Sequence, residues 1–176
     1  MRCSLLSFAS ACVLVQVSSA GVARPVQAEI LAKEEPAAEA DWRIGNVSVR
    51  FNDGHREMWT RNGSCRLPRV GKTGAVAWVR CTKLEKNDRR WVSSEIRVIR
   101  QNYVRDFKPG QLIVTDMAFA DGDRSLIVAS MMFHGPRLFE KYSLSSGRRV
   151  AHFTESEAGD AEASDYPRWV EPVLGE

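Results

Sequence analysis

Apolar and polar residues alternate with a period of two through most of residues 42–154. The stretches NVSVRF (46–51) and AVAWVRC (75–81) alternate residue by residue, whereas LIVTDMAF (112–119) and SLIVASMMF (125–133) are apolar runs with the length of buried strands. No window of ten or more residues carries an apolar stripe at helical spacing. The pattern therefore predicts an all-β domain, built as an antiparallel meander of about eight or nine strands.

The motif FNDGHRE at 51–57 recurs in similar form as FADGDRS at 119–125. Asp-Gly between two alternating segments is the strongest short-range signal for a β-hairpin, because a two-residue type I′ turn needs positive φ at both central positions. Two further segments, HGP (134–136) and SSG (145–147), also have the composition of turns. The predicted turn residues are Asp53, Gly54, Asp121, Gly122, Gly135 and Gly147.

Two-residue turns also predict which residues face each other. A turn at Asp53-Gly54 places Arg50 opposite Glu57, and a turn at Asp121-Gly122 places Met117 opposite Leu126. With the two later turns, residues 112–153 form four consecutive antiparallel strands.

Two motifs accompany this four-strand unit. Phe-x-Asp-Gly precedes an apolar strand, and Tyr-x-Leu-x-x-Gly-x-x-Val crosses the last turn from Tyr142 to Val150. With them the unit resembles one blade of a β-propeller of the tryptophan-aspartate-repeat and quinoprotein type, and residues 44–100 resemble a second, more irregular blade. The resemblance implies about two blades, whereas propellers close with about four to eight. Either copies of the chain assemble, or the hairpins close a small barrel or sandwich, which the size of the β region favours.

Residues 1–28 have the pattern of a secretory signal peptide. One arginine precedes an apolar run from Leu5 to Val17, which is shorter than the roughly 20 residues of a membrane-spanning helix. Small residues then permit cleavage after Ala20 or after Ala28. The sequence therefore predicts a secreted or periplasmic protein that is not a lipoprotein and has no membrane span once the signal is removed.

Charge divides the rest of the chain into three parts. The Ala/Glu-rich segment 29–41 has five acids and one base, residues 42–154 have ten acids and 21 bases, and residues 155–176 have seven acids and one base. This composition predicts a basic all-β domain over 42–154, flanked by an acidic linker and a disordered acidic C-terminal tail. The aromatic residues Tyr166 and Trp169 leave open the alternative that the C-terminal tail docks on the domain.

Signal cleavage would leave two cysteines, Cys65 and Cys81. In an oxidising compartment an even pair usually forms a disulfide, and a hairpin centred on Thr73 would place the two residues opposite each other. The alternative is two free thiols, since Pro68 interrupts the first strand of that hairpin.

The sequence contains no recognisable catalytic constellation. It lacks a metal-spaced histidine pair, a phosphate loop and a dinucleotide fingerprint, so no metal site, catalytic residue or cofactor is predicted. Asp121 and Asp123 have the spacing of a calcium loop, but apolar residues follow where further ligands are needed. A site could still assemble from distant residues, and the candidates for such a pocket are His55, His134, Asp116 and Asp123.

Three functional hypotheses follow. The first is a non-catalytic binding or structural module of the bacterial envelope, the second a secreted hydrolase whose histidines and acids meet only in the fold, and the third a propeller subunit that oligomerises to bind a partner. The excess of arginine predicts an envelope protein or a polyanion as the partner of an Arg-rich face. Nucleic acid is not expected, because the chain is predicted to be exported.

Overall fold

The computed structural model describes residues 22–32, 44–85, 90–101, 103–155 and 166–174, and within them the protein is almost entirely β-sheet. The strands are β1 Pro25–Ala32, β2 Gly45–Phe51, β3 Arg56–Met58, β4 Cys65–Val70, β5 Val76–Glu85, β6 Arg90–Arg100, β7 Tyr103–Phe107, β8 Ile113–Ala120, β9 Ser125–Met131, β10 Leu138–Ser143 and β11 Arg149–Thr154. A 3-10 helix, η2, spans Arg168–Val173. The predicted all-β class is confirmed.

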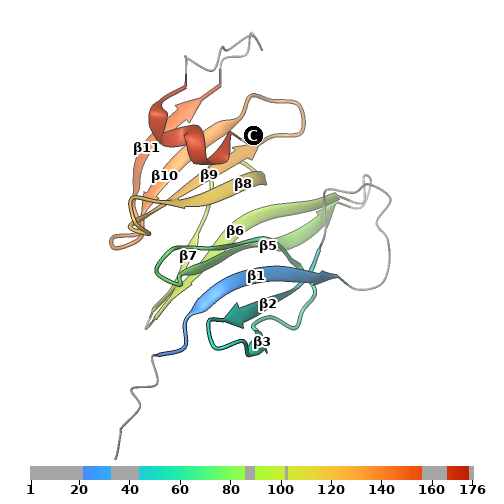
Figure 1. Cartoon of the computed structure of the whole chain (residues 1–176). Coiled ribbons are helices and arrows are strands. Elements are labelled where there is room, and N and C mark those ends of the chain that lie inside the picture. The colour runs from blue at the N-terminus through green and yellow to red at the C-terminus, as the bar shows by residue number, and fades with distance from the viewer. Residues whose placement is uncertain (1–21, 33–43, 86–89, 102, 156–165, 175–176) are drawn as a thin grey trace, which may run out of the picture.

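The strands form two antiparallel sheets, neither of which closes into a barrel (Figure 1). Sheet A has seven strands in the order β1-β2-β4-β5-β6-β7, with β3 paired to β2. Sheet B has the order β11-β10-β9-β8. Sheet B therefore contains the four consecutive strands that the apolar runs and turns of residues 112–153 predicted.

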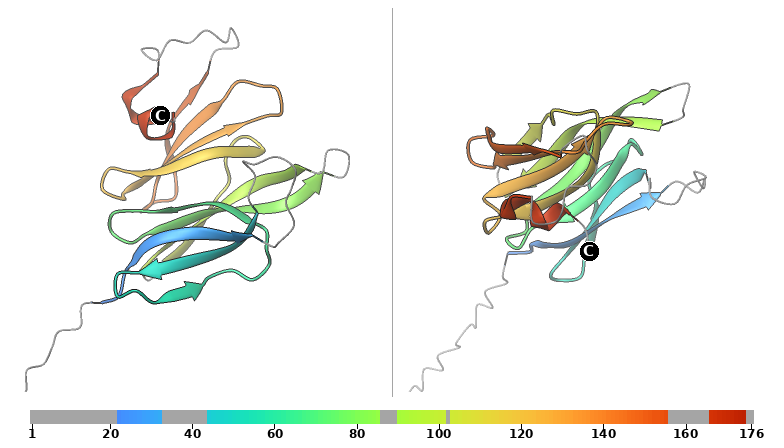
Figure 2. Two further views of the ribbon diagram at one scale, coloured as in Figure 1. Left: turned by 45° about the vertical axis from the view of Figure 1, so that its right-hand side comes forward. Right: turned by 90° about the horizontal axis from the view of Figure 1, so that it is seen from above.

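Sheet A bends sharply at one point. The pairing of β2 with β4 consists of a single register pair, Gly45 with Cys65, so β1, β2 and β3 are free to fold over the face of β5 and β6. Val47 and Val49 from β2 consequently pack against Val76 and Trp78 from β5. The chain thus forms three stacked layers, β1–β3, β4–β7 and β8–β11 (Figures 1 and 2).

A second core joins the middle layer to sheet B. The alternating pattern of β5 and β6 places one set of apolar side chains on the first core and the other set here. Its fully buried members include Ile96 and Val98 from β6, with Met117 and Leu126 from sheet B. Both faces of the middle layer are therefore apolar and covered.

The β2–β3 hairpin turns through three residues, 52–54, rather than through two. Gly54 has a φ of 91°, which suits the left-handed last position of a three-residue loop. Arg50 therefore faces Arg56, and the predicted pairing of Arg50 with Glu57 is wrong by one residue.

The β8–β9 hairpin turns through four residues, 121–124. Met117 faces Val128, so the predicted pairing with Leu126 is wrong by two residues, a shift that keeps the side chains from Asp116 to Ala120 on their predicted face. The longer loop arises because three successive residues adopt positive φ: Asp121 (54°), Gly122 (64°) and Asp123 (62°). Gly135 and Gly147 lie in the β9–β10 and β10–β11 connections.

The predicted disulfide is absent, and Cys65 and Cys81 are both buried free thiols. The β4–β5 hairpin is centred on Thr73 as predicted, since Val70 faces Val76. The register then shifts by one residue between Arg66 and Arg69, around Pro68. As a result Cys65 faces Arg80 instead of Cys81.

We expect both thiols to be unreactive in the folded protein. Burial raises the pKa of Cys65, and burial raises the pKa of Cys81 to about 11, so neither forms the nucleophilic thiolate near neutral pH. Treating the chain from Gly21 with N-ethylmaleimide should add no mass before denaturation and two adducts after it, as measured by intact mass spectrometry. A denatured, unreduced chain that takes up no adduct would show that the disulfide forms.

The N-terminal boundary of the domain is also corrected. Residues 25–32 form β1, which pairs with β2 from Pro25 opposite Phe51 to Ala32 opposite Gly45, so the segment 29–32 is not linker. Its composition is weakly strand-forming, and the strand is stabilised by pairing and by packing of Ile30 on the first core. The signal segment through residue 21, the linker residues 33–41 and Trp42 lie outside the described residues.

The C-terminal segment docks on sheet B, which corrects the prediction of a disordered tail for residues 166–174. Val170 and Val173 of η2 are buried against the outer face of sheet B, the face turned away from sheet A (Figure 2). Ile127 and Phe139 are their buried partners in the sheet. This segment therefore completes the third core of the protein.

Candidate functional site

The four residues of the predicted weak pocket lie in separate places. His55 is in the β2–β3 turn, Asp123 in the β8–β9 turn, Asp116 within β8, and His134 in the β9–β10 turn at the opposite end of sheet B. The seven residues of β9 alone hold Asp123 and His134 about 20 Å apart. In the described part of the chain no hydrogen bond or ion pair joins any two of the four. The hydrolase hypothesis thus loses the pocket on which it depended.

His55 instead belongs to its own turn. Its Nδ1 lies 2.5 Å from Oδ1 of Asp53, and its ring stacks on Phe51 with centroids 4.2 Å apart. The contact with Asp53 raises the pKa of His55. The pair lies on an exposed hairpin and is not part of a cleft.

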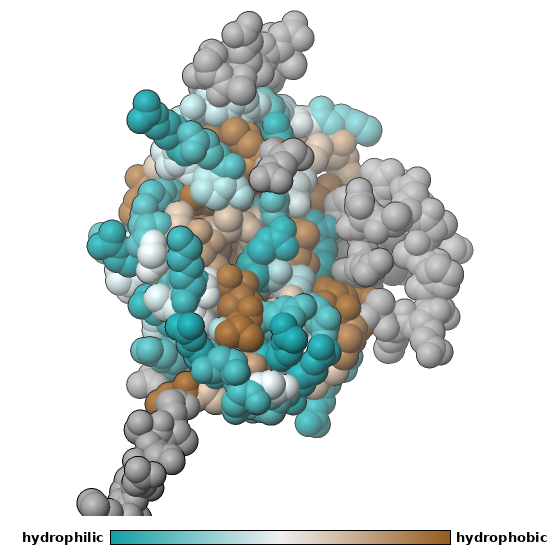
Figure 3. Space-filling view, viewed as in Figure 1, coloured by the Kyte–Doolittle hydropathy of each residue, from teal (hydrophilic) through white to brown (hydrophobic). Residues whose placement is uncertain are grey.

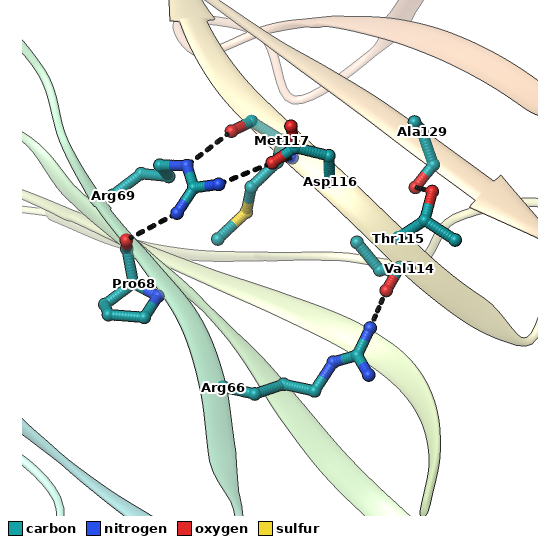
Figure 4. Close-up of polar contacts among 8 residues, drawn as sticks. All are labelled: Arg66, Pro68, Arg69, Val114, Thr115, Asp116, Met117 and Ala129. Atoms are coloured by element: carbon teal, nitrogen blue, oxygen red, sulfur yellow. Dashed lines mark hydrogen bonds and ion pairs between the residues drawn. The ribbon is translucent and has the colours of Figure 1, made fainter. Parts of the chain in front are cut away.

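Asp116 is engaged at the seam between the two sheets (Figure 4). Its Oδ1 accepts hydrogen bonds from Nη2 of Arg69 at 2.6 Å and from the backbone N–H of Met117 at 2.7 Å. Arg69 and the buried Arg66, both on β4, also donate to the carbonyls of Met117 and Val114. These arginines cover the free edge of β8, which is the last strand of sheet B.

Turns from all three layers meet at one end of the molecule, on the left of Figure 1. The β8–β9 turn is bonded to sheet B and to the middle layer, because the backbone N–H of Leu144 in the β10–β11 turn donates to the carbonyl of Arg124, and Nη1 of Arg100 donates to the carbonyl of Asp123. We call this region the turn end. Its surface is mainly hydrophilic (Figure 3).

Asp123 is buried at the turn end and ties sheet B to sheet A. Its Oδ2 accepts hydrogen bonds from the backbone N–H of Thr73 at 2.5 Å and from the hydroxyl of Thr73 at 2.8 Å. Gly71 makes this contact possible, since a Cβ at that position would lie 2.4 Å from the carboxylate. The second Asp-Gly motif therefore forms a turn of sheet B and also binds sheet B to the β4–β5 turn of sheet A.

An open depression of about 490 Å³ lies beside this turn, on the outer face of sheet B. Its floor is polar, because β9 and β10 change from apolar to polar side chains as they approach the turn end. Ser125, Lys141 and Ser143 project there, whereas Ile127 and Phe139 further along the same face are covered by η2. We call this hollow the outer depression.

The outer depression has a positive balance of charge. Asp121 is neutralised, since its Oδ2 lies 2.8 Å from Nζ of Lys141 and accepts a hydrogen bond from Ser125 at 2.7 Å. Lys141 and then Ser125 lower the pKa of Asp121, which keeps its carboxylate ionised and internally paired. Arg100 and Arg124 then supply two net positive charges at the rim. Arg124 uses only Nε, to the carbonyl of Asp121, among the described contacts, and both of its Nη groups remain available.

The C-terminal segment forms one wall of the outer depression through Trp169. The same side chain packs against the third core, so Trp169 borders both the apolar and the polar half of the face. Glu155 fastens the start of this segment: it is bound by Nη2 of Arg137 at 2.8 Å and by a short hydrogen bond from the hydroxyl of Tyr166. Tyr166 also packs edge-on against Phe139, with ring centroids 5.7 Å apart.

Glu155 should make docking of this segment sensitive to acid. Hydrogen bonds from Arg137 lower the pKa of Glu155 from 4.5 to about 2, so its stabilising contribution is complete above about pH 4.5 and is lost as the pH falls toward 2. Glu155→Gln should lower the free energy of unfolding at pH 7 by about 2 kcal/mol and flatten its decline between pH 5 and pH 2. Urea unfolding at several pH values tests this. An unchanged decline in the variant would assign the acid sensitivity to other carboxylates.

Several arginines of the predicted basic domain form ion pairs and are not free for an Arg-rich face. Examples are Arg56 with Glu29 (2.6 Å), Arg69 with Asp116 (2.6 Å), Arg80 with Glu95 (3.1 Å) and Arg97 with Asp106 (2.7 Å). Sequence reasoning did not identify the residues that line the outer depression, among them Arg124, Lys141 and Ser143. One sequence feature could have indicated the strand residues of this hollow. Lys141 and Ser143 are polar residues at outward positions of β10, whose other outward residue, Phe139, is apolar.

Among the described residues there is no group of three or more His, Cys, Asp or Glu side chains that could hold a metal ion. No helix in the described ranges is long and apolar enough to cross a membrane.

The open, layered sheets define a β-propeller-like fold. Among solved structures, the chain is similar to the β-propeller domain of the Trilobed protease from Pyrococcus furiosus, with a TM-score of 0.54 and 14% sequence identity. The match covers 76% of this chain but only 43% of that chain. No family model matches the sequence, and neither does any curated protein. At this identity the likeness shows the fold alone.

Proposed function

We propose that this protein is an exported, non-catalytic binding module of the bacterial envelope that holds an anionic ligand in the outer depression. The observation that carries the proposal is the charge of that hollow, where Lys141 neutralises Asp121 while Arg100 and Arg124 remain at the rim. Guanidinium groups suit bidentate contacts with carboxylates and phosphates. Turns tied to one another by hydrogen bonds supply a rigid frame for such contacts.

The module acts as a self-contained unit, not as a subunit that needs further copies. Its three layers are stacked like consecutive propeller blades, and neither outermost face is open to a further blade, since one is charged and the other is covered. On the β1–β3 layer, Glu29 and Arg56 form an ion pair at 2.6 Å on the outward side. On sheet B, the C-terminal segment buries Val170 and Val173 where another blade would pack. Two capped ends favour a monomer over the oligomeric propeller.

Calorimetric titration with poly-L-glutamate and with polyphosphate, at low and at physiological ionic strength, tests the binding proposal. The double variant Arg100→Ser and Arg124→Ser should bind about tenfold more weakly than the wild type. The matched control is Arg50→Ser, because Arg50 is exposed on the β1–β3 layer, and it should bind like the wild type. Absence of wild-type binding, or an equal loss in the control, would refute the proposal.

Export predicts a specific mature N-terminus. Cleavage after Ala28 would remove the first four residues of β1, whereas cleavage after Ala20 would leave the strand whole. We therefore expect the exported chain to begin at Gly21, as measured by intact mass of protein recovered from the periplasm or the medium. A chain recovered with its first 20 residues still attached would contradict export through signal cleavage.

A further inference from the structure

Trp169 gives the outer depression a feature that simple anion binding does not require. It is an aromatic wall, carried by the C-terminal segment and placed beside cationic and hydroxyl groups of sheet B. Val170, the next residue, is fully buried and fixes the backbone that carries the ring. The ring is therefore held in place at the border of the polar floor.

The hollow combines three kinds of surface. Trp169, Val150 and Ala151 form an apolar side, Ser143 and Ser145 present hydroxyls that lie 3.0 Å from each other, and Arg124 presents free guanidinium N–H groups. An isolated phosphate or carboxylate would leave the apolar side unused. A sugar ring with a carboxylate would use all three, because it has an apolar C–H face, a rim of hydroxyl groups and one anionic group.

We infer that the ligand of the outer depression is an acidic saccharide, whose ring packs on Trp169 and whose carboxylate is bound by Arg124 and Arg100. This inference rests on the proposed function and names the ligand class of the same site. The volume of about 490 Å³ lies within the range of small-molecule sites and accommodates a short oligosaccharide.

Binding and docking of the C-terminal segment are linked in this arrangement. A ligand that contacts Trp169 stabilises the docked segment, and by reciprocity a loosened segment binds the ligand less tightly. Saturating ligand should therefore slow hydrogen exchange at the N–H of Val170, which donates to the carbonyl of Pro167. A polyanion that touches only the arginines should leave this exchange rate unchanged.

The experiment compares three probes by calorimetry: a galacturonic acid trimer, the neutral maltotriose, and poly-L-glutamate. Trp169→Leu, which keeps apolar packing but lacks a ring, should weaken binding of the galacturonate trimer about tenfold, and Trp169→Phe should restore most of it. The Arg124→Ser variant should weaken both acidic probes. Maltotriose should bind at least tenfold more weakly than the galacturonate trimer.

A second variant keeps the inference testable if Trp169→Leu loosens the segment. Ser143→Ala leaves η2 untouched, and it should weaken the galacturonate trimer while sparing poly-L-glutamate. If both acidic probes bind equally and none of the Trp169 or Ser143 variants discriminates between them, the saccharide inference is overturned and the proposed function stands. If neither acidic probe binds the wild type, the proposed function itself fails.

Discussion

Replacing Asp123 with asparagine is expected to lower the free energy of unfolding by about 3 kcal/mol, measured by urea denaturation at neutral pH. The carboxylate is only 2% exposed, and its Oδ2 accepts both hydrogen bonds from Thr73. Asparagine tolerates the positive φ of this position, so the substitution removes the charge without adding backbone strain. The amide oxygen can take the place of Oδ2, but it is a weaker acceptor than a carboxylate oxygen, so both hydrogen bonds from Thr73 lose strength.

The other Asp-Gly turn provides a matched control for this prediction. Asp53 is exposed and contacts only its own hairpin, through His55, so Asp53→Asn should leave the unfolding transition unchanged within error. Gly71→Ala should reproduce the loss at Asp123, because the added Cβ would meet the carboxylate at 2.4 Å. Equal stabilities of the Asp53 and Asp123 variants would show that the second turn does not tie the sheets together.

The two Asp-Gly motifs also show which features of the fold can be predicted from this sequence. The strands and the positions of the turns could be predicted, because they depend on local alternation of apolar and polar residues and on residues that tolerate positive φ. The registers of the β2–β3 and β8–β9 pairs could not be predicted, because hairpin loops of three and four residues contain the same Asp-Gly sequence as a two-residue loop. Likewise the register shift near Pro68, which separates Cys65 from Cys81, has no unique local signature.

Both ends of the domain were misjudged for a related reason. Residues 25–28 were assigned to the signal peptide, 29–32 to a linker and 166–174 to a tail, and only their partners in the fold explain their structure. Ile30 packs on the first core, and Val170 and Val173 pack on sheet B, so in both segments apolar residues bind partners that are distant in the sequence. The outer depression could not be predicted either, because its position depends on which half of the outer face of sheet B the C-terminal segment covers.

That covering segment supports the second large prediction. A chain ending at Glu155 should lose about 4 kcal/mol or more of unfolding free energy, since fully burying a valine contributes about 1.5 to 3 kcal/mol and both Val170 and Val173 are removed. Its absence also uncovers Ile127 and Phe139, creating an apolar patch on sheet B. Thermal unfolding and light scattering should show a less stable chain that associates.

Point variants separate loss of packing from loss of length. Val170→Asp should resemble the truncated chain, whereas Glu171→Ala, which alters an exposed residue of the same helix, should behave like the wild type. The mode of association then decides between the two architectures. Irregular aggregates would mean that η2 merely covers an apolar face, in agreement with a self-contained module. A ring of defined mass would mean that sheet B accepts another copy once η2 is removed, and the oligomeric propeller would replace the monomer as the functional form.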